Sequence, residues 1–433
     1  MRFIHTADLH LGNQMHNIDR TAETSAFFDW LKLQIVREEA QALIISGDIF
    51  DNANPSIEAR TQFYTFLASL TETKCKNIIL VGGNHDSGAM LDSTKKIFEL
   101  LNIHVIGSIA NLSPSDMVFE LFDEKKNCIG ICLAVPFVRD IELRNFLQAK
   151  GIKSSDSDLL SAGYTKLYSE VFAAAEKIRA QRNLPLIATG HLYANDLEGR
   201  LKNANASVKT DDGVRVLDVL GTLGNVPQTV FPPVHYVALG HIHYSTTVAK
   251  NERIRYSGSP FVLGFDEASL PHHILLVDLK EENSFSPIVK KIQTEAHFVY
   301  KRISGSLPEI KSELQKLSLL KGQDGVKPIF IEISYKKDFS QSIKQTAQDF
   351  LEEEIKNLPS ECSVVSWRVQ ESESYNYSEM QNFDAQEIEN LDEETIFTKF
   401  ILSRIKYAPE SEEAKEILKV CLPLFLEVAG DVL

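Results

Sequence analysis

The segment Arg2-Phe3-Ile4-His5-Thr6-Ala7-Asp8-Leu9-His10 decides the fold, because a short apolar run leads into residues that can bind a metal. Four further runs before residue 245 are rich in Ile, Val or Leu and short enough for buried strands. They are Ala42–Ile45, Ile78–Val81, Leu186–Ala188 and Tyr236–Leu239. Helical periodicity in Thr24–Arg37, Ile57–Leu70 and Ser161–Arg182 separates several of the runs and favours an α/β layered core.

Each run is followed by side chains with metal-binding atoms. The candidate ligands are Asp8, His10, Asp48, Asn84, His191, His241 and His243. In α/β sheets, sites form outside the carboxyl ends of the strands, so five strands would deliver these side chains to one edge. Two carboxylates, four imidazoles and one amide oxygen suit Mn²⁺, Fe²⁺ or Zn²⁺. Seven ligands fit two ions that share a carboxylate, and two ions ~3.5–4 Å apart are typical of centres that hydrolyse phosphate esters.

Each motif also has a simpler interpretation. An isolated Asp-x-His or Gly-Asp is usually a turn or a helix cap, and Asn84-His85-Asp86 could form an Asx turn. His241 and His243 could be core histidines with hydrogen-bond partners. Five such motifs in order, each after an expected strand, favour a shared metal site over these separate explanations.

The acidic residues are concentrated in the last part of the chain, whose 433 residues carry a net charge of −15. Residues 341–433 contain 20 acidic and 8 basic residues, whereas residues 1–340 contain 40 and 37. The nearly neutral first part could therefore present a basic groove to nucleic acid. No run of about 18 apolar residues predicts a membrane span. The early Asp8 argues against a signal peptide, and five cysteines without a Cys-x-x-Cys pair predict reduced thiols in the cytoplasm.

The pattern of elements predicts several units along the chain. Residues 1–280 form the layered core, and residues 281–370 read as a separate β-α-β-α-β unit. The polar, acidic residues 371–391 suit a linker. Two helical segments occupy residues 392–433, and the first has an apolar face that contains Ile396, Phe397, Phe400 and Ile401. This face either binds a partner or packs on the preceding unit.

The motifs resemble those of the calcineurin-like metallophosphoesterases, and most closely the branch of SbcD-type nucleases. The resemblance covers about residues 1–280 and rests on His5–Gly12, Ser46–Asp51, Gly82–Ser87, Ala188–Leu192, Phe231–Pro260 and Phe265–Glu267. It implies a four-layer β-sandwich flanked by helices, a small α/β cap domain and C-terminal helices.

The resemblance also implies a role for each site residue. Asp8, His10, Asp48 and His243 would hold the first metal, and Asp48 would bridge to the second with Asn84, His191 and His241. His85 would lie near the scissile phosphate and protonate the leaving oxygen, and Asp86 would orient its ring. Two Mn²⁺ ions would be the cofactors, whereas ATP would be bound by a partner and not by this chain.

The implied partners are DNA and an SbcC-like ATPase, in a heterotetramer with two copies of each subunit. The nuclease domain would form a homodimer through Ile57–Leu70 and Leu91–Leu101, the cap would contact DNA, and the apolar C-terminal face would bind the ATPase. Candidate DNA contacts are Arg139, Arg144, Lys150, Lys153, Arg200, Lys202 and Lys209. No interaction with a membrane is expected.

The expected activity is that of a double-strand exonuclease, 3′ to 5′, and of a single-strand or hairpin endonuclease in DNA recombination, repair and replication. Two alternatives remain open at this stage. One is a phosphatase or phosphodiesterase with the same site and a non-DNA substrate, and the other is a scaffold without catalytic activity that binds an ATPase.

Overall fold

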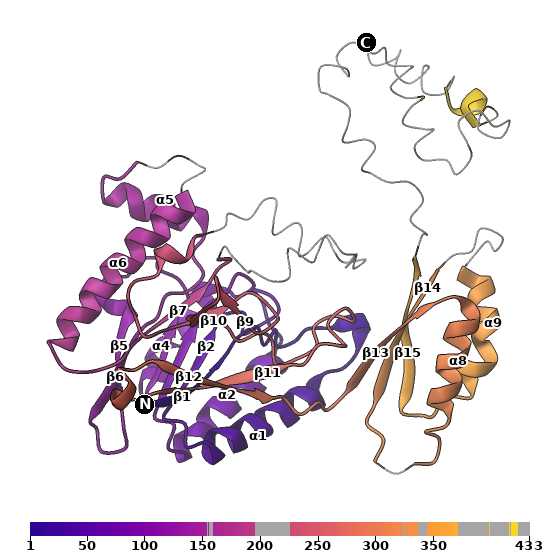
Figure 1. Cartoon of the computed structure of the whole chain (residues 1–433), viewed down its shortest axis with the longest axis horizontal. Coiled ribbons are helices and arrows are strands. Elements are labelled where there is room, and N and C mark those ends of the chain that lie inside the picture. The colour runs from indigo at the N-terminus through magenta and orange to yellow at the C-terminus, as the bar shows by residue number, and fades with distance from the viewer. Residues whose placement is uncertain are drawn as a thin grey trace.

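The structure is a computed structural model that describes residues 1–153, 155, 159–194, 226–323, 325–336, 344–370, 398, 415 and 417–422. Three sheets organise this part of the chain (Figure 1). The expected linker, residues 371–391, lies outside the described residues, as do the proposed partner-binding residues Ile396, Phe397, Phe400 and Ile401.

The first sheet has six strands in the order β12-β11-β1-β2-β3-β4. Its strands β1 to β4 run parallel, and β11 and β12 add an antiparallel pair beside β1. The bounds are β1 Arg2–Thr6, β2 Ala42–Ser46, β3 Asn77–Val81, β4 Ile103–Ile106, β11 His273–Leu279 and β12 Pro287–Gln293.

The second sheet also has six strands, in the order β5-β6-β7-β8-β10-β9. Strands β6, β7, β8 and β10 are parallel, and β5 and β9 are antiparallel edge strands. The bounds are β5 Val118–Phe122, β6 Cys128–Leu133, β7 Leu186–His191, β8 Tyr236–Gly240, β9 Thr246–Val248 and β10 Asn251–Tyr256.

Helices cover the outer faces of the two sheets. The helices are α1 Thr21–Arg37, α2 Ile57–Ser69, α3 Gly88–Ser93, α4 Lys95–Glu99, α5 Asp140–Ala149 and α6 Leu159–Arg179. Short 3-10 helices are η1 Met15–Asn17, η2 Leu70–Glu72, η3 Pro114–Met117, η4 Gln228–Val230 and η5 Glu281–Asn283. Helices α1 and α2 pack on the first sheet and α6 packs on the second, which gives four layers and confirms the predicted fold class (Figure 1).

The apolar runs in the sequence arise because each central strand is buried on both faces. In β1, Phe3 faces the second sheet, whereas the adjacent Ile4 packs with residues of α1 and α2. His5 on the inner face joins the sheets, since its ring nitrogens lie 3.0 Å from the Tyr236 hydroxyl and 3.2 Å from the Leu239 carbonyl oxygen. The carboxyl end of β1 is thereby tied to β8.

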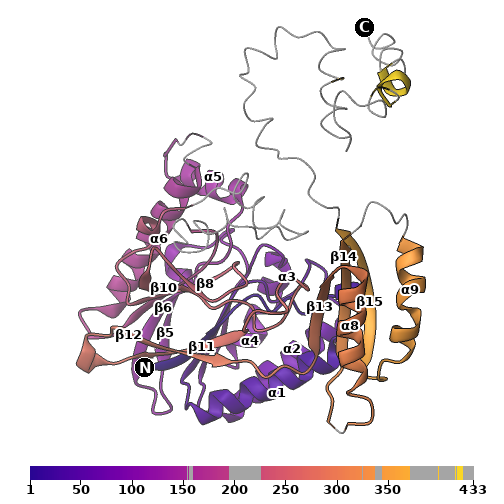
Figure 2. The ribbon, with the colours of Figure 1, turned by 45° about the vertical axis from the view of Figure 1, so that its right-hand side comes forward.

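A three-stranded parallel sheet forms the cap, in the order β13-β14-β15. Its elements are β13 Val299–Gly305, α8 Leu307–Ser318, β14 Ile329–Lys336, α9 Lys344–Lys356 and β15 Cys362–Gln370, which is the β-α-β-α-β order read from the sequence. One face of the sheet packs on α8 and α9. The other face contacts the sandwich through a cluster of Met15, Ile18, Phe265, Phe298 and Tyr300. Figure 2 shows this sheet beyond one end of α1, where Tyr300 bonds to Glu23.

The first unit continues beyond the boundary at residue 280 that we expected. Strand β12, Pro287–Gln293, pairs along its whole length with β11 and so belongs to the first sheet. It was missed because it is an edge strand that contains the exposed, adjacent residues Lys290 and Lys291 and therefore lacks a continuous apolar run. Among the described residues, no helix is long and apolar enough to span a membrane.

Candidate metal centre

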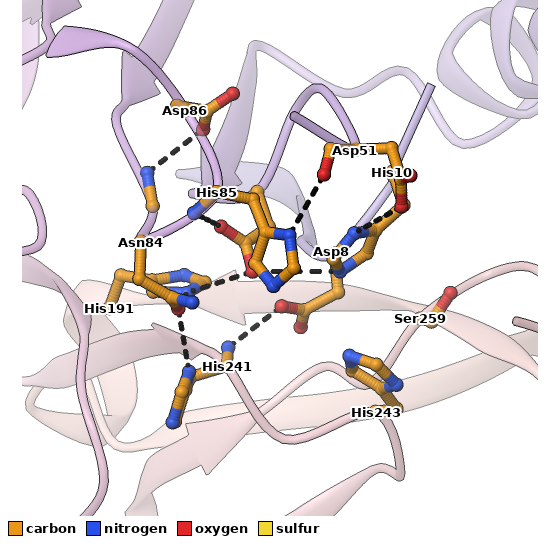
Figure 3. A network of polar contacts seen from close by, with 12 residues as sticks. Asp8, His10, Asp51, Asn84, His85, Asp86, His191, His241, His243 and Ser259 are labelled. Atoms are coloured by element: carbon orange, nitrogen blue, oxygen red, sulfur yellow. Dashed lines mark hydrogen bonds and ion pairs between the residues drawn. The ribbon is translucent and has the colours of Figure 1, made fainter. Parts of the chain in front are cut away.

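The seven predicted ligands, together with His85, converge at the carboxyl ends of strands from both sheets. Figure 3 shows all of them but Asp48 with labels. The segments after β1, β2 and β3 bring Asp8, His10, Asp48 and Asn84 from the first sheet. Strand β7 ends at His191, and the segment after β8 brings His241 and His243 from the second sheet. The site therefore lies where the sandwich layers meet.

Two groups of possible ligand atoms form within this set. Ligand atoms of Asp8, His10 and His243 all lie within 4.8 Å of one another, as do those of Asp48, His191 and His241. The two groups meet at Asp48, whose Oδ2 lies 3.5 Å from His10 Nε2 and 3.3 Å from His191 Nε2. Asp48 is thus placed to share its carboxylate between two cations.

Three of the histidines are oriented by an acceptor at Nδ1. His191 Nδ1–H donates to the Ser46 carbonyl oxygen at 2.8 Å, and His243 Nδ1–H donates to Glu267 Oε1 at 2.8 Å. His10 Nδ1 lies 3.3 Å from Asp51 Oδ1. Because a neutral imidazole carries one N–H, each of these contacts leaves an Nε2 lone pair free to bind a metal.

Several nitrogen and oxygen atoms of the site direct lone pairs toward one another with no hydrogen atom to share. With the Nδ1 proton of His191 committed to Ser46, its Nε2 is an acceptor that lies 2.9 Å from Asn84 Oδ1, and the same oxygen is 2.9 Å from His241 Nδ1. Asp8 Oδ2 and His10 Nε2 are buried without a hydrogen-bond partner. Converging acceptors need either protons or cations between them, so the donor set fits divalent metal ions.

The pKa values describe what happens without a cation. Burial lowers the pKa of His191, but the nearby carboxylate of Asp48 outweighs that effect and raises it to about 9. In His243, burial is likewise outweighed by the hydrogen bond to Glu267, and the pKa is raised to about 9. A metal-free site would therefore take up protons at positions where a metal ion would bind.

The ligand loops have an unusual backbone conformation. Asp8, His10 and Asp48 have φ values of 54°, 44° and 48°, in the left-handed region that side chains rarely adopt. Gly47 is also left-handed, with φ of 88°, and a Cβ there would collide with the ring of His191. A glycine at this position lets β2 end in direct contact with β7 and places Asp48 between the two groups.

His85 and Asp86 do not interact in the expected way. The Nδ1–H of His85 donates to the carbonyl oxygen of Asp51 at 2.8 Å, and the ring centroid lies 4.7 Å from that of His10. We expected the Asp86 carboxylate to orient this ring, and that contact is not formed. Asp86 is buried and instead accepts backbone N–H bonds from Ile49, Phe50 and Gly83 at 3.1, 2.9 and 2.9 Å.

The contacts of Asp86 define a positioning role. Its carboxylate joins the loop that carries Asp48 to the loop that carries Asn84 and His85. Adjacency in the sequence suggested a contact between Asp86 and His85, but consecutive residues in a turn point their side chains in different directions. The ring of His85 is oriented by Asp51.

Two acidic residues near the centre were not among the predicted ones. Asp51 contacts both His10 and His85, and Glu267 holds His243. Both lie within segments that carry the family resemblance, Ser46–Asp51 and Phe265–Glu267. The acidic residue in each segment could have been predicted as a partner of a ligand histidine, because a metal-bound histidine commonly donates its second N–H to a carboxylate.

The structure gives little support to the proposed basic groove. Lys150 forms an ion pair of 2.8 Å with Glu170 of α6, which neutralises its charge locally. Arg139 precedes α5, Arg144 lies on it, and Lys153 is exposed beyond its end. Arg200, Lys202 and Lys209 lie outside the described residues.

Two facing sheets carry paired groups of candidate metal ligands at their common edge. Together with the family match below, this arrangement defines a metallophosphoesterase, a hydrolase that uses divalent metal ions. The chain belongs to the calcineurin-like phosphoesterase family, whose model matches residues 1–245. It is similar to the SbcD subunit of the nuclease SbcCD from Escherichia coli K12, with 32% identity over 324 residues, 73% of this chain and 74% of that protein.

Proteins of the same name from two other bacteria are also similar. The Rhodobacter capsulatus protein is 33% identical over 286 residues, which cover 64% of this chain and 66% of its own. The Bacillus subtilis protein is 27% identical over 281 residues, with coverage of 65% and 66%. These relatives support the nuclease interpretation, not the phosphatase alternative.

Proposed function

We propose that this chain is the nuclease subunit of an SbcCD-type complex and that it hydrolyses phosphodiester bonds in DNA with two Mn²⁺ ions. The observation that carries the proposal is the position of Asp48 between two groups of converging nitrogen and oxygen atoms. A nucleic acid as the substrate is supported by the names of the relatives, which call them nuclease subunits, and DNA is what the family resemblance implies.

In this proposal Asp8, His10 and His243 hold one ion, Asn84, His191 and His241 hold the other, and Asp48 contacts both. The ions would lower the pKa of a bound water and polarise the phosphate. His85 would transfer a proton to the leaving oxygen: the Nδ1–H bond to Asp51 orients the ring, and Nε2 would carry the transferred proton. Its position beside His10, near the exposed side of the centre, suits contact with a substrate phosphate.

The proposed partners are an SbcC-like ATPase, which would bind ATP, and a second copy of this chain, in a heterotetramer with two of each subunit. Dimerisation through α2 and the region of α3 and α4 is supported by the exposure of large apolar side chains there. Ile57 is 76% exposed, Ile97 66% and Leu100 85%. Such side chains are stabilised when a partner covers them. We also propose that the cap, which the sequence placed at residues 281–370, contacts DNA. Residues 392–433 would bind the ATPase.

We further infer a cytoplasmic location. It is supported by the described cysteines, which are all unpaired thiols. The proposed activities are those expected above, exonuclease cleavage of double strands and endonuclease cleavage of single strands or hairpins. They would serve recombination, repair and replication of DNA.

The test compares cleavage of labelled hairpin DNA and of a small generic phosphodiester, each with Mn²⁺. Wild-type protein should cleave the hairpin, and Asp48→Asn should lose both cleavage and tight Mn²⁺ binding because it weakens both metal groups at once. Asp29→Asn, which makes the same change at an exposed position of α1, serves as the matched control. Hydrolysis of the small ester but of no DNA form would reject DNA as the substrate, and retained cleavage by Asp48→Asn would reject the shared carboxylate.

A further inference from the structure

A chain of hydrogen bonds links the cap to the start of α1. The hydroxyl of Tyr300 on β13 donates to Glu23 Oε2 at 2.9 Å, and Arg20 Nε donates to the same oxygen at 2.7 Å. The guanidinium of Arg20 also lies over the rings of Tyr300 and Phe261, 5.5 Å from each centroid. Arg20, Glu23 and Tyr300 are all at most 9% exposed, so water competes little for these contacts.

The same chain continues from Arg20 to the candidate metal centre. Arg20 Nη1 donates to Asn13 Oδ1 at 3.2 Å, and Asn13 Nδ2 donates to Asp51 Oδ1 at 3.1 Å. Asp51 Oδ1 in turn lies 3.3 Å from Nδ1 of the ligand His10. The orientation of the Asn13 amide is fixed, because a guanidinium only donates and a carboxylate only accepts.

These contacts make the position of His10 depend on a residue of another domain. The Asp51 carboxylate that orients the His10 ring is held by Asn13, and Asn13 is held by Arg20. Arg20 is fixed by Glu23 and by the aromatic ring of Tyr300. An acceptor that orients a metal-binding histidine affects metal affinity, so a change at the cap end can reach the first metal group.

We propose that the cap tunes the first metal group, Asp8, His10 and His243, through this chain, with Tyr300, Arg20 and Asn13 as positioning residues. The proposal rests on the proposed function of that group as a metal site. Docking of the cap itself depends mainly on the apolar cluster of Met15, Ile18, Phe265 and Phe298. Removing the hydroxyl of Tyr300 should therefore leave the cap in place and weaken only this chain of hydrogen bonds.

The test measures Mn²⁺ binding to the metal-free full-length protein by isothermal titration calorimetry. Tyr300→Phe should weaken the first group about three- to tenfold, less than the loss expected when a direct partner of a ligand is removed. The Mn²⁺ affinity of the second group should not change. Because His243→Ala removes a ligand of the first group only, it shows which binding event in the titration belongs to that group. The matched control is Tyr335→Phe, since Tyr335 is equally buried, 6% against 6%, but packs in the core of the cap.

A double-mutant cycle with Asn13→Ala tests whether the two residues act through one chain. The combined loss of Mn²⁺ affinity should be clearly smaller than the product of the two single losses, because the second substitution breaks a chain already interrupted. On hairpin DNA, Tyr300→Phe should lower kcat at subsaturating Mn²⁺ and leave KM unchanged. Saturating Mn²⁺ should restore most of the activity.

The outcomes separate this inference from the proposed function. Unchanged Mn²⁺ affinity in Tyr300→Phe, or an equal loss in Tyr335→Phe, would overturn the coupling even if the wild-type protein cleaves DNA. Independent effects in the cycle would also overturn it. A selective loss of first-group affinity in a protein that cleaves no DNA would support the coupling and reject the nuclease proposal.

Discussion

Substitution of Asp86 by Asn separates a positioning role from direct participation in catalysis. The carboxylate accepts three backbone N–H bonds, from Ile49 and Gly83 on Oδ2 and from Phe50 on Oδ1. An amide offers a single acceptor oxygen, so the two bonds to Oδ2 can survive, whereas the Phe50 N–H would face an NH₂ group. One unsatisfied buried N–H costs about 1–3 kcal/mol, and the remaining bonds lose their charge-assisted part. We expect the free energy of unfolding to fall by about 2–5 kcal/mol in total.

The assay for Asp86→Asn combines urea denaturation of the metal-free protein with amide hydrogen exchange in the 47–50 and 82–86 loops. The free energy of unfolding should fall by the amount above, and exchange should accelerate in both loops. Affinity for both metals should fall, because the two loops carry Asp48 and Asn84. The control is Asp278→Asn, which removes a partly exposed ion pair with Arg2 and should cost less than about 1 kcal/mol. Lost cleavage with unchanged stability, exchange and metal affinity would refute this reasoning and return Asp86 to a direct role beside His85.

Three further predictions concern the proton donor, the pH dependence and the partner. His85→Ala should retain both metals and lose cleavage about 10²–10⁴-fold; loss of a metal in a titration would instead make His85 a ligand. Because the pKa of His191 and that of His243 are each raised to about 9 in the metal-free site, Mn²⁺ must displace protons below that pH. Mn²⁺ affinity should therefore rise with pH until about 9, and calorimetry in buffers of different ionisation enthalpy should detect proton release; an affinity independent of pH would contradict both shifts. Phe397→Asp should abolish co-purification with the ATPase and spare Mn²⁺-dependent cleavage, whereas intact co-purification would exclude this face as the interface.

The architecture was predictable because burial on both faces leaves a continuous apolar run for each central strand. The runs at Ala42–Ile45 and Ile78–Val81 gave the parallel core directly. Strand β12 was not predictable in the same way. It pairs on one side only and has no fully buried residue, so its membership of the first sheet depends on its tertiary partner β11.

The meeting of the ligands was predictable for a topological reason. Residues that follow parallel strands reach one edge whatever the details of packing, which is why His191 and His241 lie together although each comes from a different motif. The contacts between side chains at that edge depend on the direction of each side chain, so they could not be predicted from the sequence. The partners of Asp86, and the roles of Asp51 and Glu267, follow from how the loops turn after each strand and not from their sequence spacing.

The backbone at the centre shows that the loops with the candidate ligands adopt a strained conformation. Left-handed conformations at Asp8, His10 and Asp48 cost roughly 1–2 kcal/mol per residue. Hydrogen bonds between the loops offset this cost, since Asp8 N–H donates to the Gly47 carbonyl oxygen and His10 N–H to that of Asp48, each at 3.0 Å. Contacts between the protein's own loops thus offset part of the strain. We therefore expect the affinity for cations to depend on the residues that hold the loops as well as on the ligands themselves.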